Sequence, residues 1–479
     1  MLFNSLEYLI FLPIVFALYW AVPHKWRWTV VFVSSYYFYM SWNAKYLLLI
    51  VFITGISFMG ALLVEKAKDR KRKKFWVWAV IVASLALLFL FKYFNFVAGT
   101  ITQLLRSVSV STPSLALSLL LPVGISFYTF QSIGYIVDVY RGELPAEHHI
   151  GKYAAFVSFF PQLVAGPIER AKNLLPQLRQ ERHFDYTQAT YGLKLMAWGY
   201  FKKIVVADTL AAYVDKLYEN MRFFYGSSRL LVIFFFTIQI YCDFSGYSDI
   251  ARGTAKLFGV ELMENFKSPY FAASIREFWH RWHISLSTWF RDYVYIPLGG
   301  SRVGKLRNAW NLMVTFLLSG LWHGASWTFV AWGGLHGGLQ VAEKQIDNIQ
   351  KTKRESKLFH GFKVVITFLL VSALWVFFRA QSFKDAAYML VYWYRGLHDP
   401  LRWLTGAFSG LGINLGTGLQ ILLMLTILTV FDYLSLKRDV IASVSKWKLP
   451  LRWALYIGFV VLIFFLAPAE SAEFIYFDF

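Results

Sequence analysis

Cysteine and charge are both scarce in this chain of 479 residues. Cys242 is the only cysteine, which excludes an intrachain disulfide and any metal or redox site of the Cys-x-x-Cys type. Charged residues make up 16% of the sequence, against roughly a quarter in an ordinary soluble domain. Acidic residues are the rarer kind, with 28 against 48 basic ones. This composition disfavours a soluble globular protein.

Apolar residues take the place of charge. Hydrophobic residues account for 57% of the chain and aromatic residues for 19%. Because a membrane-spanning helix needs about 20 apolar residues, the length and pattern predict an all-α polytopic membrane protein with about 11–13 helices. The apolar stretches lie near residues 5–22, 28–42, 45–64, 75–97, 115–140, 153–166, 190–213, 229–250, 311–326, 327–342, 364–379, 415–434 and 453–467.

Lysine and arginine gather in short clusters between these stretches. The clusters lie at residues 66–74, 351–357 and 437–452. Cytoplasmic loops are enriched in basic residues, so we expect all three on the cytoplasmic side, beside anionic lipids. This placement explains the net charge of +20 without a nucleic-acid partner, which we do not expect. Counting spans onward from these loops places the tail, residues 468–479, on the extracytoplasmic side or in a cavity open to it.

The middle of the chain, residues 241–345, is the predicted functional core. Tyr241–Asp249 carries two carboxylates beside the end of a span, and Phe278–Tyr293 mixes aromatic residues with histidine and arginine. Polar groups at membrane depth are costly and usually face a protein interior or a wet cavity. Since no soluble domain or short repeat interrupts the pattern, we expect a single domain over residues 1–479.

His323 is the leading catalytic candidate, because it lies inside the apolar segment Leu317–Trp327. Gly320 and Gly324 flank it at four-residue spacing. Small residues at this spacing either permit close helix packing or let a substrate approach the imidazole. An apolar environment favours the neutral imidazole, which can act as a general base. A purely structural role in helix packing remains the alternative.

A second group of histidines follows a helical spacing. Glu277, His280 and His283 recur every three residues, which predicts that they share one helix face. Such a row suggests a metal site, but the second Glu-x-x-His of a di-iron bundle is missing, so we predict no metal. The alternative is an ion-paired polar plug at the membrane interface, made by Arg276, Arg281, Arg291 and Asp292. His336, which lies between two glycine pairs, is predicted to be structural.

Six motifs, in this order along the chain, are similar to those of the membrane-bound O-acyltransferases. They are Met1–Ser5, Pro122–Gln131, Phe159–Glu169, Phe278–Ser287, Arg291–Tyr293 and Leu321–Ala325. The branch that they resemble most O-acetylates alginate, other exopolysaccharides and peptidoglycan, and it includes the D-alanyl transferase for teichoic acids. The resemblance covers essentially the whole chain. It implies a ring of tilted helices around a central funnel, with short cytoplasmic helices at the floor.

The resemblance also implies residue roles. The family's histidine maps onto His323 and its second polar site onto His283. The last six residues, 474–479, resemble an aromatic C-terminal hexapeptide in which a tyrosine, here Tyr476, would carry the acyl group. Asp478 departs from the Gln or Asn expected at its position. The alternative is that this aromatic tail only anchors the chain at the membrane interface.

These features together predict an acetyltransferase that spans the bacterial cytoplasmic (inner) membrane as a multi-pass protein. Acetyl-CoA is the expected donor substrate, with no bound cofactor, and Arg281, Arg291 and Lys305 are candidates to contact its phosphates. An extracytoplasmic acyltransferase partner would pass the acetyl group to a polysaccharide. The alternatives are D-alanyl transfer to teichoic acid, and a non-enzymatic transporter or scaffold of a glycan export complex.

Overall fold

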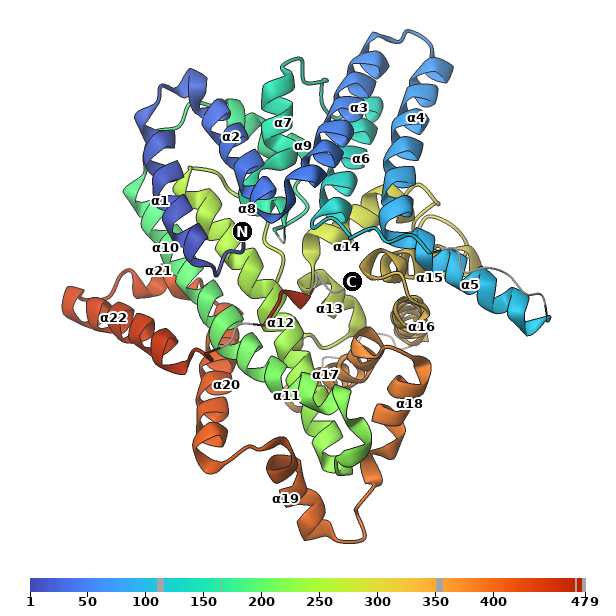
Figure 1. Cartoon of the computed structure of the whole chain (residues 1–479), viewed down its shortest axis with the longest axis vertical. Coiled ribbons are helices and arrows are strands. Elements are labelled where there is room, and N and C mark those ends of the chain that lie inside the picture. The colour runs from blue at the N-terminus through green and yellow to red at the C-terminus, as the bar shows by residue number, and fades with distance from the viewer. Residues whose placement is uncertain (110–115, 165, 350–355, 470–471, 476–479) are drawn as a thin grey trace. The chain divides into compact units, whose positions relative to one another are not determined.

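The computed structural model describes residues 1–479 apart from 110–115, 165, 350–355, 470–471 and 476–479. Throughout that part of the chain the regular elements are helices, which confirms the all-α prediction (Figure 1). Within the described residues, six helical segments are long and apolar enough to cross a membrane, so the chain is a polytopic membrane protein. They are His24–Lys66, Arg70–Ser107, Gly226–Leu257, Lys357–Arg379, Leu415–Ser435 and Leu449–Leu466. The number of spans and the ring around a funnel stay predictions.

The helices group into two compact units, one of residues 1–193 and 251–263 (unit 1) and one of residues 194–250 and 264–479 (unit 2). Unit 1 holds α1 (Leu6–Ala21), α2 (His24–Asn43), α3 (Leu47–Lys66), α4 (Arg70–Leu88), α5 (Phe94–Ser107), α6 (Ile125–Arg141), α7 (Ile150–Ser158), α8 (Phe160–Leu163) and α9 (Ala171–Arg179). Unit 2 holds η3 (Phe201–Ala207), α11 (Asp208–Glu219), α13 (Ile275–Arg281), α14 (Ile284–Phe290), α15 (Lys305–His323), α16 (Trp327–Ile349), α17 (Lys357–Arg379), α18 (Phe383–Val391), α19 (Pro400–Leu411), α20 (Leu415–Ser435), α21 (Val440–Val444) and α22 (Leu449–Leu466). The helices α10 (Tyr186–Tyr200) and α12 (Gly226–Leu257) each contribute to both.

Two predicted apolar stretches of unit 1 differ from the helices that form. The stretch near 115–140 becomes helical only at Ile125, because Gly124, with φ of +76°, adopts a left-handed backbone just before α6. The stretch near 153–166 divides at Phe159 into α7 and α8. Pro161 lies in the first turn of α8, where proline is tolerated because its missing amide hydrogen would have no helical partner.

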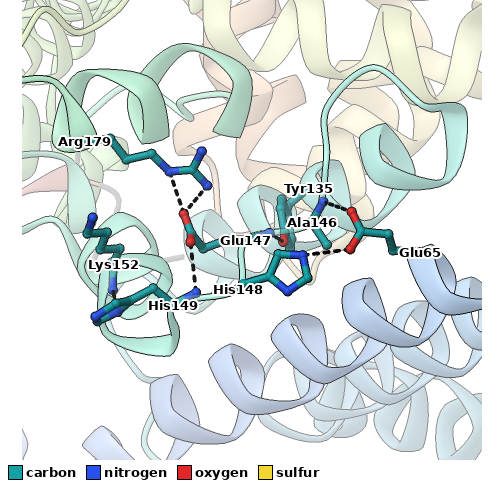
Figure 2. A network of polar contacts seen from close by, with 8 residues as sticks. All are labelled: Glu65, Tyr135, Ala146, Glu147, His148, His149, Lys152 and Arg179. Carbon is teal, nitrogen blue, oxygen red and sulfur yellow. Dashed lines mark hydrogen bonds and ion pairs between the residues drawn. The ribbon is translucent and has the colours of Figure 1, made fainter.

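A polar network in unit 1 ties the loop between α6 and α7 to three neighbouring helices (Figure 2). The buried carboxylate of Glu147 accepts a hydrogen bond from Nε of Arg179 on α9 at 2.8 Å. The amide of Glu147 donates to Oη of Tyr135 on α6 at 2.8 Å. Glu65, near the end of α3, pairs with Nε2 of His148 at 2.8 Å. Since these partners come from separate helices, the loop is held by side chains rather than by regular secondary structure.

Glu169 is a buried carboxyl group of unit 1, outside the membrane-spanning segments. It is 2% exposed and accepts a hydrogen bond from the amide of Met263. Burial raises the pKa of Glu169 to about 7, although hydrogen bonds and the Arg170 guanidinium oppose the shift. This carboxyl group therefore titrates close to neutral pH.

The core of unit 2 is unusually aromatic. Trp282, Trp332 and Trp375 are all buried, and Trp375 lies at its centre. The Trp375 ring stacks on Trp332 at a centroid distance of 5.4 Å and meets Trp282 at 4.9 Å. Aromatic pairs of this geometry each add about 0.5–1.5 kcal/mol beyond the burial of their area. His323 lies against this cluster, with its ring centroid 5.0 Å from that of Trp332.

Candidate active site

The hairpin of α15 and α16 places His323. His323 is the last residue of α15, and Gly324 ends the helix. A Cβ atom on Gly320 would lie 2.3 Å from the carbonyl oxygen of Phe329, and one on Gly333 would lie 2.2 Å from that of Phe316. Both distances are far below van der Waals contact. The helix face beside His323 is therefore filled by α16, so Gly320 permits close packing and does not leave an open approach.

Aromatic rings surround the His323 imidazole, which is 1% exposed. The ring centroid of Trp332 lies 5.0 Å away at 88°, and that of Phe378 lies 5.5 Å away at 67°. Trp322, its neighbour in sequence, makes a similar edge contact at 5.0 Å. These contacts orient the imidazole in a low-dielectric environment, where electrostatic interactions are stronger than in water.

His283 occupies a strained backbone position. It follows α13, which ends at Arg281, and its φ of 42° and ψ of 54° are left-handed. A residue other than glycine in this region costs about 1–3 kcal/mol and persists only where its surroundings enforce it. Asn265 supplies that enforcement, because its backbone oxygen accepts from the Ile284 amide at 3.0 Å and its Oδ1 from the Ser285 amide at 3.1 Å. Strain of this kind gathers at functional sites.

The same turn corrects the prediction that Glu277, His280 and His283 share a helix face. Because α13 ends at Arg281, His283 points into the core and is fully buried, whereas His280 is exposed. Glu277 pairs with Arg281 at 2.5 Å. Among the described residues, no group of three or more histidine, cysteine or acidic side chains is placed to hold a metal ion.

The structure brings the two predicted catalytic histidines together. Their ring centroids lie 6.1 Å apart, with the planes inclined at 56°. This separation is too long for a direct hydrogen bond between the rings. Burial lowers the pKa of His283 to about 3, so its imidazole is neutral at physiological pH. One nitrogen of a neutral imidazole donates a hydrogen bond and the other accepts one.

His336 packs inside the protein between α13 and α16, and its predicted structural role stays a prediction. Its Nδ1 accepts a hydrogen bond from Nε1 of Trp279 at 3.3 Å. The ring also stacks nearly parallel on Phe278, at 6.2 Å and 8°. His336 is fully buried, and these contacts fix α13 against α16.

A pocket of about 360 Å³ in unit 2 opens between α13, α14, α15 and α16. Its basic lining residues are Arg276, His280, Arg291 and Lys344. Ser319 of α15 also lines it, one helical turn before His323. The pocket therefore combines basic groups with a wall that reaches the helix carrying the candidate base.

Only one of the three predicted phosphate-binding residues lines this pocket. Arg291 lines it, whereas Arg281 is paired with Glu277, and Lys305 begins α15 outside the lining. The sequence analysis did not assign Arg276 or Lys344 to the donor. These two lie on different helices, 68 positions apart in numbering, so no spacing rule connects them.

The described part of the C-terminal tail reaches this region of unit 2. Phe474 is fully buried, with its ring centroid 4.3 Å from that of Tyr247 and 6.0 Å from that of Phe244. Phe244 in turn meets His283 at 4.6 Å. Phe474 thus packs inside the protein rather than at a lipid interface. Tyr476, the predicted acyl carrier, lies outside the described residues.

Comparison with known proteins gives a family match over the middle of the chain. The membrane-bound O-acyltransferase family model matches residues 143–383. A Pseudomonas aeruginosa protein named "Probable alginate O-acetylase AlgI" is 40% identical over 388 residues, which cover 81% of this chain and 73% of that protein. The peptidoglycan O-acetyltransferase of Helicobacter pylori is 33% identical, covering 81% and 79%. A teichoic acid D-alanyltransferase of Streptococcus thermophilus is 29% identical, covering 50% and 61%.

Proposed function

Because the chain belongs to the membrane-bound O-acyltransferase family, we propose that this O-acyltransferase takes acetyl groups from cytosolic acetyl-CoA. The acetyl groups cross the bacterial inner membrane and are used for O-acetylation of an extracytoplasmic polysaccharide. The similar proteins named for alginate and peptidoglycan support a glycan of this kind as the final acceptor.

The single observation that carries the proposal is the buried pair of imidazoles. His323 ends α15 and His283 lies in the turn between α13 and α14, and their ring centroids are 6.1 Å apart inside an aromatic core. Acyl transfer to a hydroxyl needs a base for the hydroxyl proton and a hydrogen-bond donor for the oxygen that becomes negative. Two imidazoles around one reacting group, one acting as the base and the other as the donor, would supply both.

The chemistry follows from these roles. His323 accepts the proton of the attacking hydroxyl as its oxygen forms a bond to the acetyl carbonyl carbon. His283 donates a hydrogen bond to the carbonyl oxygen, which carries the negative charge of the tetrahedral intermediate. The carbon–sulfur bond then breaks, and His323 returns its proton to the departing CoA thiolate. The products are an acetyl ester and CoA with a free thiol.

The basic pocket is the proposed entrance for the donor. Phosphate groups are bound well by arginine and lysine, and Arg276, Arg291 and Lys344 provide three such side chains around one cavity. The acetyl end of the donor would extend past Ser319 toward His323. Arg281 and Lys305 remain weaker candidates for phosphate contact, since neither lines the pocket.

The acceptor hydroxyl is proposed to belong to Tyr476, from which an extracytoplasmic acyltransferase partner would pass the acetyl group to the glycan. The burial of Phe474 two residues earlier, beside Phe244 and in turn His283, supports this route. A tyrosine hydroxyl acetylated by this reaction is an activated ester, suited to a second transfer.

Purified protein in detergent, incubated with acetyl-CoA radiolabelled in the acetyl group, tests the proposal. Wild-type protein should acquire label, and both His323→Ala and Tyr476→Phe should lose it. Label that persists in His323→Ala would overturn the role of the base. Label lost only in His323→Ala would move the acceptor away from Tyr476.

D-alanyl transfer is the second candidate, because a teichoic acid D-alanyltransferase is among the similar proteins. Label from carrier-bound D-alanine, in the absence of label from acetyl-CoA, would favour it. A transporter or scaffold would take up no label from either donor, and its cellular function would survive His323→Ala.

A further inference from the structure

A buried ion cluster in unit 2 contacts the main chain of the C-terminal segment. Nζ of Lys203, on η3, lies 2.8 Å from Oδ1 of Asp208 and 2.8 Å from Oδ1 of Asp243. All three side chains are at most 3% exposed. Figure 1 shows the described tail, in dark red, running beside α12, the helix that carries Asp243.

The remaining hydrogen bonds of this cluster go to the tail. Lys203 Nζ donates to the carbonyl oxygen of Ala472 at 3.0 Å. Oδ2 of Asp243 accepts from the amide of Ile475 at 2.8 Å. The cluster therefore holds the Ala472 carbonyl oxygen and, three residues later, the Ile475 amide, and Lys203 also makes a longer contact of 3.5 Å with the Glu473 carbonyl oxygen.

The number of hydrogen-bond donors on the Lys203 ammonium group makes the tail part of the cluster. A lysine ammonium has three N–H donors, and the three shortest contacts of Lys203 are with Asp208, Asp243 and Ala472. Without the tail, one of these donors and one carboxylate oxygen of Asp243 would each lose a partner inside the protein. Charged groups buried without partners are strongly unfavourable, so the cluster favours the docked tail.

We propose that Lys203 and Asp243 are positioning residues that hold the C-terminal segment against the wall of the histidine site. The docked segment places Phe474 on Tyr247 and near Phe244, and Phe244 contacts His283. The consequence for transfer rests on the proposed function. The docking itself does not, and it can be measured separately.

The first test reports docking without any assay of activity. Ile475 is 6% exposed, so Ile475→Cys, made in a Cys242→Ser background, gives a single thiol that a docked tail protects. Reaction of folded protein with a maleimide should be at least tenfold faster once Asp243→Ala is added. Asp243→Asn should keep part of the protection, because its amide oxygen still accepts from the residue 475 amide while its NH2 group replaces the oxygen that pairs with Lys203.

A neighbouring ion pair gives the matched control. Lys202 is also buried, and its Nζ lies 2.6 Å from Oδ2 of Asp249 and 2.9 Å from Oγ of Ser245, none of which belongs to the tail. Lys202→Met should leave the thiol protected. Equal exposure in Lys202→Met and Asp243→Ala, or no exposure in folded Asp243→Ala, would overturn the proposal.

A second test leaves the ion cluster intact. Ile475→Pro removes the amide that donates to Asp243, whereas Ile475→Val keeps it. Acetyl transfer should fall at least tenfold in kcat for Ile475→Pro, with an unchanged KM for acetyl-CoA, and Ile475→Val should behave like the parent. A parental kcat in Ile475→Pro would count against positioning. If the thiol is protected as expected but the protein shows no acetyl transfer, the proposed function is rejected and the docking of the tail still stands.

Discussion

The imidazoles of His283 and His323 lie in one buried site, although the backbone is helical at His323 and left-handed at His283. His323 ends the regular helix α15, whereas His283 sits in a left-handed turn between two short helices. Their ring centroids are 6.1 Å apart. This pairing gives separate predictions for the two residues, one about chemistry and one about strain.

Replacing His323 by alanine should remove transfer and leave folding intact. Loss of a general base lowers rates by about a hundredfold or more, so initial rates with labelled acetyl-CoA should fall at least this far. Protein yield and monodispersity in detergent should stay near the wild-type values. His336→Gln is the comparison, since glutamine keeps an acceptor for Nε1 of Trp279 and should retain most of the activity.

The strain at His283 predicts an inverted order of stability for two small substitutions. In an ordinary helix, glycine is about 1 kcal/mol less stable than alanine. At a left-handed position alanine carries a steric cost that glycine lacks. The free energy of unfolding of His283→Gly should therefore exceed that of His283→Ala by about 1 kcal/mol, and His283→Gly should unfold at the higher temperature. Both should lack activity. Thermal unfolding in detergent measures the order, and a more stable alanine variant would contradict the strain.

Gly333→Ala should destabilise the α15–α16 hairpin. The new Cβ would lie 2.2 Å from the Phe316 carbonyl oxygen, and overpacking of this kind costs about 1–3 kcal/mol. Activity should fall with stability, because the hairpin places His323. Gly338→Ala, on the same helix with nothing within 4 Å of the added carbon, should be neutral or stabilising. Similar melting temperatures for the two variants would show that the helices adjust freely.

The basic pocket predicts a binding defect rather than a chemical one. Arg276→Glu or Lys344→Glu should raise the KM for acetyl-CoA about tenfold, the effect of losing roughly 1.4 kcal/mol of phosphate binding, with a smaller change in kcat. The increase should shrink at high salt, which screens exposed charges. Lys305→Glu, outside the lining, should change KM less. An equal increase in all three variants would point to a diffuse surface charge instead of a pocket.

Glu169 predicts a pH dependence of stability. The folded-state pKa of about 7 lies above the ordinary value of 4.5, so the folded protein binds a proton that the unfolded chain releases. Its contribution is complete below pH 4.5 and is lost as the pH rises through 7, by roughly 3 kcal/mol. Glu169→Gln should flatten this decline. Melting temperatures measured from pH 4.5 to 8 compare the two proteins, and parallel profiles would exclude the shift.

Much of the fold could be predicted because the membrane imposes it. Apolar stretches such as 415–434 and 453–467 correspond closely to α20 and α22. Short helices were not predictable in this way. The polar helix α9 and the helices α13 and α14 lack a long apolar run, and α6 begins late because Gly124 adopts a left-handed backbone.

The residues of the candidate site could be selected from the sequence where single residues stood out against their surroundings. His323 interrupts an apolar segment, and Asp243 and Asp249 are carboxylates beside a span. Their partners were not evident, because Lys202 and Lys203 lie within another apolar stretch, 47 and 40 positions before Asp249 and Asp243. Spacing rules also failed at His283, where a single left-handed residue rotates the side chain off the face of α13.

Lys203 and Asp243 form hydrogen bonds with main-chain atoms of the tail, and this has an evolutionary consequence. Hydrogen bonds to the Ala472 carbonyl and the Ile475 amide are indifferent to the side chains at those positions. Drift in residue type is therefore tolerated along the docked segment wherever the new side chain fits. A single insertion or deletion between Ala472 and Ile475 would instead change the spacing of these two contacts. We expect selection to preserve the length of this segment more strictly than the identities of its residues.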